Sequence, residues 1–91
     1  MKVLQRGQMP DETDIQIEEW SEDYPFYPYG GIIAAYPKNR YGEKIRAYKT
    51  FESTEEAEKA FKALKNGDKT LTDFNFVAKE RGRDIPYQAK L

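Results

Sequence analysis

Carboxylates gather in the first third of the chain, where seven acidic residues lie between Asp11 and Asp23. One aromatic side chain, Trp20, stands among them and another, Tyr24, follows directly. Carboxylates spaced along a strand beside aromatic anchors can imitate the phosphates of a nucleic acid or bind a basic partner. The pattern predicts an acidic surface for binding a macromolecule, with the residues Glu18, Glu19, Trp20, Glu22, Asp23 and Tyr24.

Two other interpretations of these carboxylates stay open. Calcium binds oxygen ligands at loop spacing, but the segment from Asp11 to Asp14 lacks the glycine and the terminal glutamate of a calcium loop. No metal site is therefore predicted. The charges also suit a solvated strand edge, where they deter pairing between sheets.

Basic residues and tyrosines alternate between positions 38 and 49. Ammonium and guanidinium groups can contact phosphates, and tyrosine rings offer stacking planes for bases. An exposed sheet face of ordinary polarity has the same composition, so that interpretation also stays open. As an alternative to the acidic surface we predict a basic surface for nucleic acid, with the residues Lys38, Arg40, Lys44, Arg46 and Tyr48.

One amphipathic helix is predicted from Thr54 to Asn66. Ser53 and Glu56 form a capping box, in which the serine hydroxyl accepts a hydrogen bond from the glutamate amide. Gly67 ends the helix because glycine adopts the left-handed conformation without a steric penalty. The narrow apolar face needs a sheet beneath it, and its residues are Ala57, Ala60, Phe61 and Leu64.

The remaining elements are strands and turns. Apolar runs and period-two alternation predict strands at residues 2–6, 15–20, 32–36, 44–51 and 70–79. Residues 37–42 and 81–83 are predicted turns, and residues 84–91 are a predicted tail. The fold class that follows is α+β: an antiparallel sheet of three or four strands with one amphipathic helix packed on one face.

Residues 21–29 form a separate aromatic segment with two prolines. Proline removes a backbone donor and favours extended geometry in the preceding residue, which predicts an ordered loop. Its aromatic side chains either form a binding surface or close the open end of a small core. They are Tyr24, Phe26, Tyr27 and Tyr29.

Several functional classes are disfavoured by composition. The chain has no histidine and no cysteine, which removes the usual general base and any thiolate nucleophile. Glu18 and Glu22 could act as an acid–base pair, but without a recognisable nucleophile we predict no enzyme, no cofactor and no small-molecule substrate. The longest apolar run is Ile32 to Tyr36, so no membrane span or signal peptide is predicted and the cytoplasm is the expected location.

Residues 31–66 carry a resemblance to a known family. They contain G-x-I-x-A, a polar turn that ends in Gly42, and then I-R-A-Y-K-T-F-E-S-T-E-E-A-E-K-A. This pattern resembles the three-stranded-sheet-plus-helix (AP2-like) DNA-binding domains at the N-terminus of phage and transposon tyrosine integrases. The resemblance implies that the basic surface enters the major groove of DNA. The acidic and aromatic segments stand where that family has a basic first strand.

The 91 residues are predicted to form one domain with an uneven charge distribution. Its parts are the acidic segment 1–29, the strand-turn-strand-helix unit 30–67, and the strand and tail 68–91. Residues 1–36 carry a net charge of −5 and residues 37–91 carry +4, and such a dipolar surface steers charged partners.

We expect a small, non-enzymatic binding or regulatory protein that engages a macromolecule through a charged surface. The expected partner is a protein, with DNA as the alternative. A structural or oligomerising subunit is a third hypothesis. By analogy of size and composition with small phage-encoded inhibitors, we expect the gene to belong to a phage or mobile element.

Overall fold

The alternating residues form one sheet. The computed structural model describes residues 2–19, 31–39, 41–80 and 82–87. Within them the elements are β1 (Val3–Gln8), β2 (Asp14–Glu19), β3 (Gly31–Tyr36), β4 (Ala47–Phe51), α1 (Thr54–Asn66), β5 (Val77–Glu80) and β6 (Arg83–Pro86). All strand pairs are antiparallel, in the order β1-β2-β3-β4-β5-β6.

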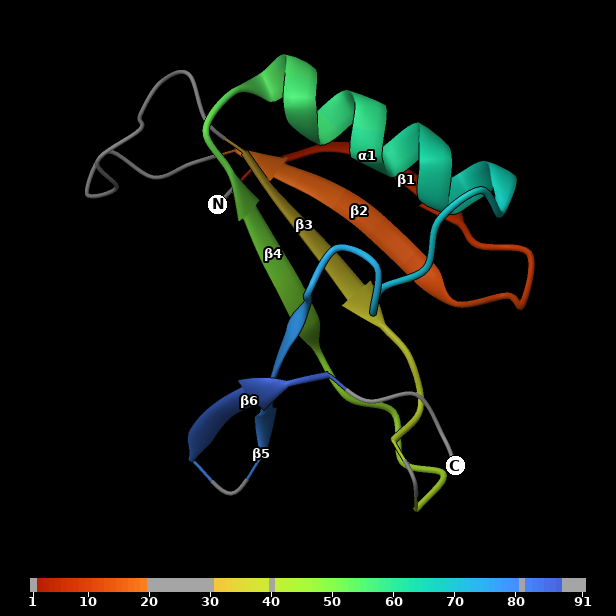
Figure 1. The fold of residues 1–91 in the computed structure, drawn as a ribbon, viewed down its shortest axis with the longest axis vertical. Helices are drawn as coiled ribbons and strands as arrows, with labels where there is room; N and C mark the ends of the chain where they lie inside the picture. Colours follow the sequence, from red (N-terminus) through yellow and green to blue (C-terminus); the bar gives the residue numbers. More distant parts are fainter. Residues whose placement is uncertain (1, 20–30, 40, 81, 88–91) are drawn as a thin grey trace.

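The sheet has two different faces. α1 lies across β2, β3 and β4, and the β5–β6 hairpin extends at the end of the molecule away from the helix (Figure 1). No described helix covers the opposite face, which we call the helix-free face. The α+β class and the helix on an antiparallel sheet are confirmed, but the described residues form a sheet of six strands rather than three or four.

The core lies between α1 and the sheet. Ile15 and Ile17 of β2 and Ile33 of β3 are buried there, together with Phe76 from the segment before β5. Burying each of these side chains stabilises the fold by about 1.5–3 kcal/mol. The predicted apolar face of the helix is confirmed, because all four of its residues are buried: Ala57, Ala60, Phe61 and Leu64.

Both ends of α1 form as predicted. The Ser53 hydroxyl accepts a hydrogen bond of 3.1 Å from the Glu56 amide. Gly67 has a φ of 81°, and its amide donates to the carbonyls of Ala63 and Leu64. No helix in the described ranges is long and apolar enough to cross a membrane.

The strands differ from the prediction mainly after the helix. Residues 71–75 form turns instead of the first half of a strand, because Thr70 and Asp73 exchange side-chain-to-backbone hydrogen bonds of 2.8 and 3.2 Å. The predicted turn is wrong at Arg83 and the predicted tail is wrong for residues 84–86, because Arg83–Pro86 pairs with β5 as an edge strand. β4 begins at Ala47 rather than Lys44, since Lys44 forms only an isolated bridge to Lys38.

Candidate functional site

Polar residues of three chain segments meet on the helix-free face. Side chains alternate between the faces of a strand, so Gln16 and Glu18 point away from α1 while the isoleucines of β2 point toward it. Gln16 stands opposite Ala34 in the register, which places Tyr36 on the same face at the end of β3. Arg46, directly before β4, reaches this face from the other side of β3.

These four residues form a hydrogen-bonded group that we call the Glu18–Arg46 network. Arg46 binds the carboxylate with both of its terminal nitrogens: Nη2 lies 2.8 Å from Oε1 and Nη1 lies 3.1 Å from Oε2. Gln16 Nε2 donates to Oε2 over 2.6 Å. Arg46 Nη1 also donates to the Tyr36 hydroxyl over 2.8 Å, and its guanidinium lies 5.9 Å from the centre of that ring.

The network keeps both charges at neutral pH. Burial would raise the pKa of the Glu18 carboxyl, but the hydrogen bonds from Arg46 and Gln16 outweigh burial and lower that pKa. The hydrogen bond to Glu18 raises the pKa of the Arg46 guanidinium against the effect of its partial burial. A proton shuttle needs a pKa near the working pH, so these groups bind and orient rather than exchange protons.

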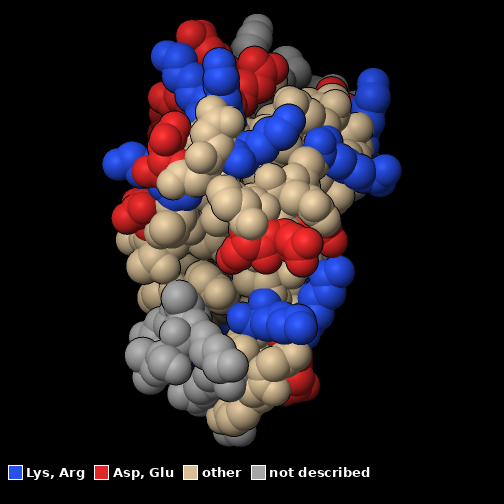
Figure 2. Space-filling view, turned by 90° about the vertical axis from the view of Figure 1, so that its right-hand side faces the viewer, with Lys and Arg blue, Asp and Glu red and all other residues tan. Residues whose placement is uncertain are grey.

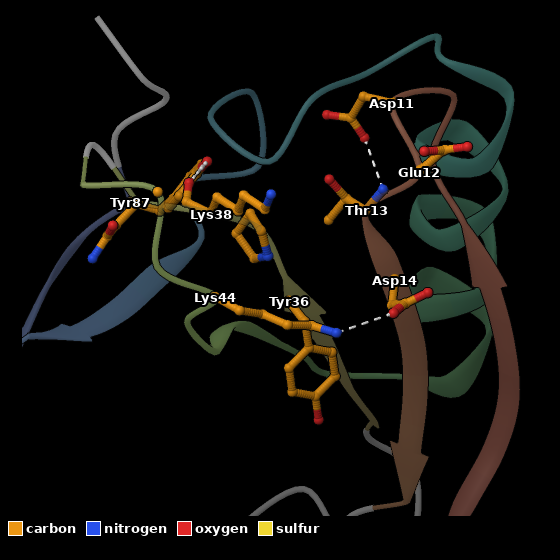
Figure 3. Close-up of a pocket in the computed structure, with 11 residues that line it drawn as sticks. Asp11, Glu12, Thr13, Asp14, Tyr36, Lys38, Lys44 and Tyr87 are labelled. Atoms are coloured by element: carbon orange, nitrogen blue, oxygen red, sulfur yellow. Dashed lines mark hydrogen bonds and ion pairs between the residues drawn. The ribbon is translucent and has the colours of Figure 1, made fainter.

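A second ion pair borders an open cleft. Lys44 Nζ lies 3.4 Å from Asp14 Oδ2, and both side chains are exposed. Beside this pair lies a depression of about 610 Å³, which we call the charged cleft. Figure 3 shows acidic residues of the β1–β2 turn along one wall and lysines along the other. The charged residues that line the cleft are Asp11, Glu12 and Asp14 on one side and Lys38 and Lys44 on the other.

Local hydrogen bonds hold both walls in place. The Asn39 side-chain oxygen accepts from the amides of Tyr41 and Glu43 at 2.9 and 3.0 Å, which fixes the loop between β3 and β4. Asp11 Oδ1 accepts from the Thr13 amide at 3.0 Å. Glu12 has a φ of 71°, a left-handed conformation that is strained for a residue with a β-carbon. The cleft is therefore largely preformed.

Tyr87 closes one end of the charged cleft. Burial raises the pKa of its hydroxyl, and the negative charge of Asp11 raises it further. The hydroxyl lies 3.5 Å from the Lys38 carbonyl oxygen, and the Tyr87 amide donates to the Phe76 carbonyl at 2.8 Å. This end of the cleft thus combines an aromatic ring with negative potential.

The predicted acidic surface is only partly described. Glu18 is buried and bound to Arg46, and Glu19 is partly buried at the end of β2. Trp20, Glu22, Asp23 and Tyr24 lie outside the described residues, and so do Phe26, Tyr27 and Tyr29 of the aromatic segment.

The predicted basic surface lies next to the same strand. Lys38 and Lys44 line the charged cleft, Arg46 belongs to the network, and Tyr48 stands opposite Ala34 on the helix-free face. Arg40 lies outside the described residues. The structure therefore joins Glu18 and Arg46, which the sequence assigned to two separate surfaces, in one ion pair.

Three contributors to the site were not predicted from the sequence. Gln16 and Tyr36 lie on the helix-free face, and strand alternation could have indicated this for both. Tyr87 reaches the cleft only because β6 pairs with β5, which no local signal indicated. Across the described ranges, no group of three or more His, Cys, Asp or Glu side chains is placed to hold a metal ion.

Charge on the side of the molecule that carries the β1–β2 turn is mixed. Figure 2 shows basic and acidic side chains interspersed there, with no large area of one sign. Comparisons of the chain with protein-family models, curated proteins and solved structures find no match. The site must therefore be interpreted from its own geometry.

Proposed function

We propose that this chain is a non-enzymatic binding protein that engages a protein partner through the charged cleft and the adjoining Glu18–Arg46 network. The observation that carries the proposal is the pairing of charges on the helix-free face. Lys44 is 3.4 Å from Asp14, and Arg46 holds Glu18 at 2.8 and 3.1 Å. A surface that presents paired opposite charges complements a protein surface, which also carries both signs, better than it complements the uniformly negative backbone of a nucleic acid.

The dimensions of the cleft also support a partner-binding role. About 610 Å³ can accept several side chains, and two tyrosines, Tyr36 and Tyr87, contribute to its lining. Tyrosine is enriched at protein interfaces because one side chain offers apolar area and a polar end. The absence of histidine and cysteine from the sequence supports binding over catalysis.

DNA binding remains the runner-up. It is favoured by the position of Lys38, Lys44 and Arg46 on or beside one face, and it would agree with the integrase-like resemblance. Two of these cations already have carboxylate partners, so a phosphate would have to compete with Asp14 and Glu18. The origin of the gene in a phage or mobile element, and a cytoplasmic location, stay predictions.

Photo-crosslinking from the cleft tests the proposal. Lys38→p-benzoylphenylalanine places the reactive group in the charged cleft, and Lys62→p-benzoylphenylalanine on exposed α1 serves as the control. In cells that express the protein, we expect a discrete protein adduct from position 38 and none from position 62. Exchanging the charges with Asp14→Lys and Lys44→Asp keeps an ion pair but inverts its orientation, and should abolish the adduct.

A DNA titration provides the opposing outcome. Fluorescence anisotropy of a labelled mixed-sequence duplex should change little, even at low salt. Binding that weakens steeply with salt and is lost in Lys38→Glu would overturn the proposal in favour of DNA, since counterion release sets that slope. An equal adduct from positions 38 and 62 would also count against the cleft.

A further inference from the structure

The two edges of the sheet are protected to different degrees. β6 has only four residues, carries Arg83 and Asp84, and ends with Pro86. Such short, charged, proline-containing edges resist pairing with another strand. β1 is six residues long, contains neither proline nor an acidic residue, and leaves Leu4 45% exposed. Its described protections are one arginine and a register shift between Val3 and Gln5.

The direction of the backbone groups on β1 follows from one hydrogen bond. The Glu19 amide donates to the Lys2 carbonyl at 2.8 Å, so Glu19 turns its backbone groups toward β1. In an antiparallel pair alternate residues share this direction, and Ile17 and Ile15 therefore also bond to β1. Their register partners Gln5 and Gly7 face inward. The backbone groups of Arg6 and Gln8 must then point outward from the edge.

The open edge continues into the charged cleft. The side chain of Arg6 lines a second depression of about 430 Å³ on the helix-free face. This depression shares Asp14, Tyr36 and Lys44 with the charged cleft. A partner seated in the cleft can therefore extend past the Asp14–Lys44 pair to β1 without crossing the helix.

We infer that β1 accepts an extended peptide segment of the protein partner as a seventh, antiparallel strand. This inference rests on the proposed function and specifies the form of the partner. The exposed Arg6 requires an acidic residue opposite it, and the exposed Leu4 requires an apolar one, whereas Lys2 lies beyond the register shift and its carbonyl bonds to β2. An edge of six residues spans about 20 Å, which suits a peptide but is too small for a stable dimer of two copies.

A synthetic peptide tests the pairing directly. The probe is the acetylated, amidated and fluorescently labelled peptide Thr-Val-Glu-Thr-Val-Thr-Glu, whose first glutamate falls opposite Arg6 in an antiparallel alignment. We expect saturable binding by anisotropy. Replacing both glutamates with lysine should weaken peptide binding several-fold. The alternate backbone amides of the peptide form two sets: N-methylation of one set should weaken binding by about tenfold or more, and N-methylation of the other set should not. Absence of binding, or equal binding of all forms, would refute the inference.

Amide hydrogen exchange locates the bound peptide. The amide hydrogens of Arg6 and Gln8 should become protected when the peptide binds, whereas those of Gln5 and Gly7 already bond to β2 and should not change. Protection that rises with protein concentration in the absence of peptide would instead indicate pairing between two copies of the chain, and would overturn the inferred occupant.

Two matched proline variants separate this inference from the proposed function. Arg6→Pro removes an outward amide that the fold does not use, so the fold should tolerate it while peptide binding falls by about tenfold. Asp84→Pro makes the same change on β6, where the inward bond of Tyr87 to Phe76 places residue 84 outward, and should leave peptide binding intact. If the crosslink at Lys38 survives in Arg6→Pro at full yield, the cleft binds a partner but β1 does not.

Discussion

Glu18 keeps its charge inside the protein because three hydrogen bonds reach its two carboxylate oxygens. The carboxylate side chain is 3% exposed, whereas that of Arg46 is 42% exposed. Removing Arg46 therefore leaves a buried, unpaired carboxylate. Removing Glu18 leaves a guanidinium that water can reach. The cost of breaking the pair should depend on which side is removed.

We predict that Arg46→Met lowers the free energy of unfolding by about 3 kcal/mol and Glu18→Gln by only about 1 kcal/mol. Urea denaturation of the two variants measures the difference. The double variant Glu18→Leu with Arg46→Met should be more stable than Arg46→Met alone, because the buried charge is gone. Equal losses in both single variants would show that the network is solvated.

Glu12 is held in a conformation that suits glycine better. Its φ of 71° places it in the left-handed region, at the acidic wall of the charged cleft. Glu12→Gly should raise the free energy of unfolding by about 0.5–1 kcal/mol, since released strain exceeds the extra chain entropy. Asn75 has a φ of 57°, but asparagine tolerates this region, so Asn75→Gly is the control and should change stability little. Thermal unfolding compares the two variants.

The charged residues of the site could be identified from sequence, but their pairing could not. Glu18 and Arg46 are 28 positions apart. Gln16 and Glu18 share one face of β2. Glu18 and Arg46 meet on that face because the arginine side chain reaches across β3, which lies between β2 and the start of β4. Alternation gives the face of each residue, whereas the contact depends on the registers of two strand pairs.

At the scale of elements, β1 and α1 approach closely at a glycine. A β-carbon placed on Gly7 would lie 3.0 Å from Phe61 Cζ, and Phe61 is buried. We predict that Gly7→Ala lowers the free energy of unfolding by about 1–3 kcal/mol through overpacking. Gly31→Ala is the matched control, because its β-carbon would meet Ala57 Cβ at 3.4 Å and should cost little. Denaturant midpoints that move equally for both variants would contradict the prediction.

Local signals identified most elements before the end of α1. The helix has a start, an apolar face and a glycine stop, and β2 and β3 have clear alternation or a continuous apolar run. β5 and β6 have only four residues each and their stability depends on each other. The alternation predicted a strand across residues 70–79, but a turn at Asn75 interrupts it. Phe74, before this turn, packs edge-on against Phe51 with 6.3 Å between the ring centres. Phe76, after the turn, is buried in the core.

At the scale of the whole molecule, the described residues of the two charged halves of the sequence lie side by side in one sheet. The sheet interleaves them, since β2 comes from the acidic half and the residues before β4 come from the basic half. Opposite charges are therefore neutralised locally, as Figure 2 shows for one side. Charges interleaved in this way produce weaker long-range steering than two separate charged halves would.

The same interleaving links stability to pH. Hydrogen bonds from Gln8 and Lys44 lower the pKa of Asp14, and those from Arg46 and Gln16 lower the pKa of Glu18 despite burial. A carboxyl group with a lowered pKa in the folded state stabilises the fold above its ordinary pKa and loses that contribution as pH falls through the folded value. For Glu18 the loss begins below about pH 4.5, the ordinary pKa of glutamate.

We therefore predict that the protein loses more stability than its Glu18→Gln variant between about pH 6 and about pH 3. The variant cannot bind a proton at position 18, so its urea midpoint should fall less steeply with acid, although it starts from a lower value. Parallel curves would mean that Glu18 has the same pKa in the folded and unfolded states, which is incompatible with a carboxylate held by Arg46 at 2.8 Å. A difference confined to the acid range would identify the Glu18–Arg46 pair as a charge-dependent connection between the two halves of the chain.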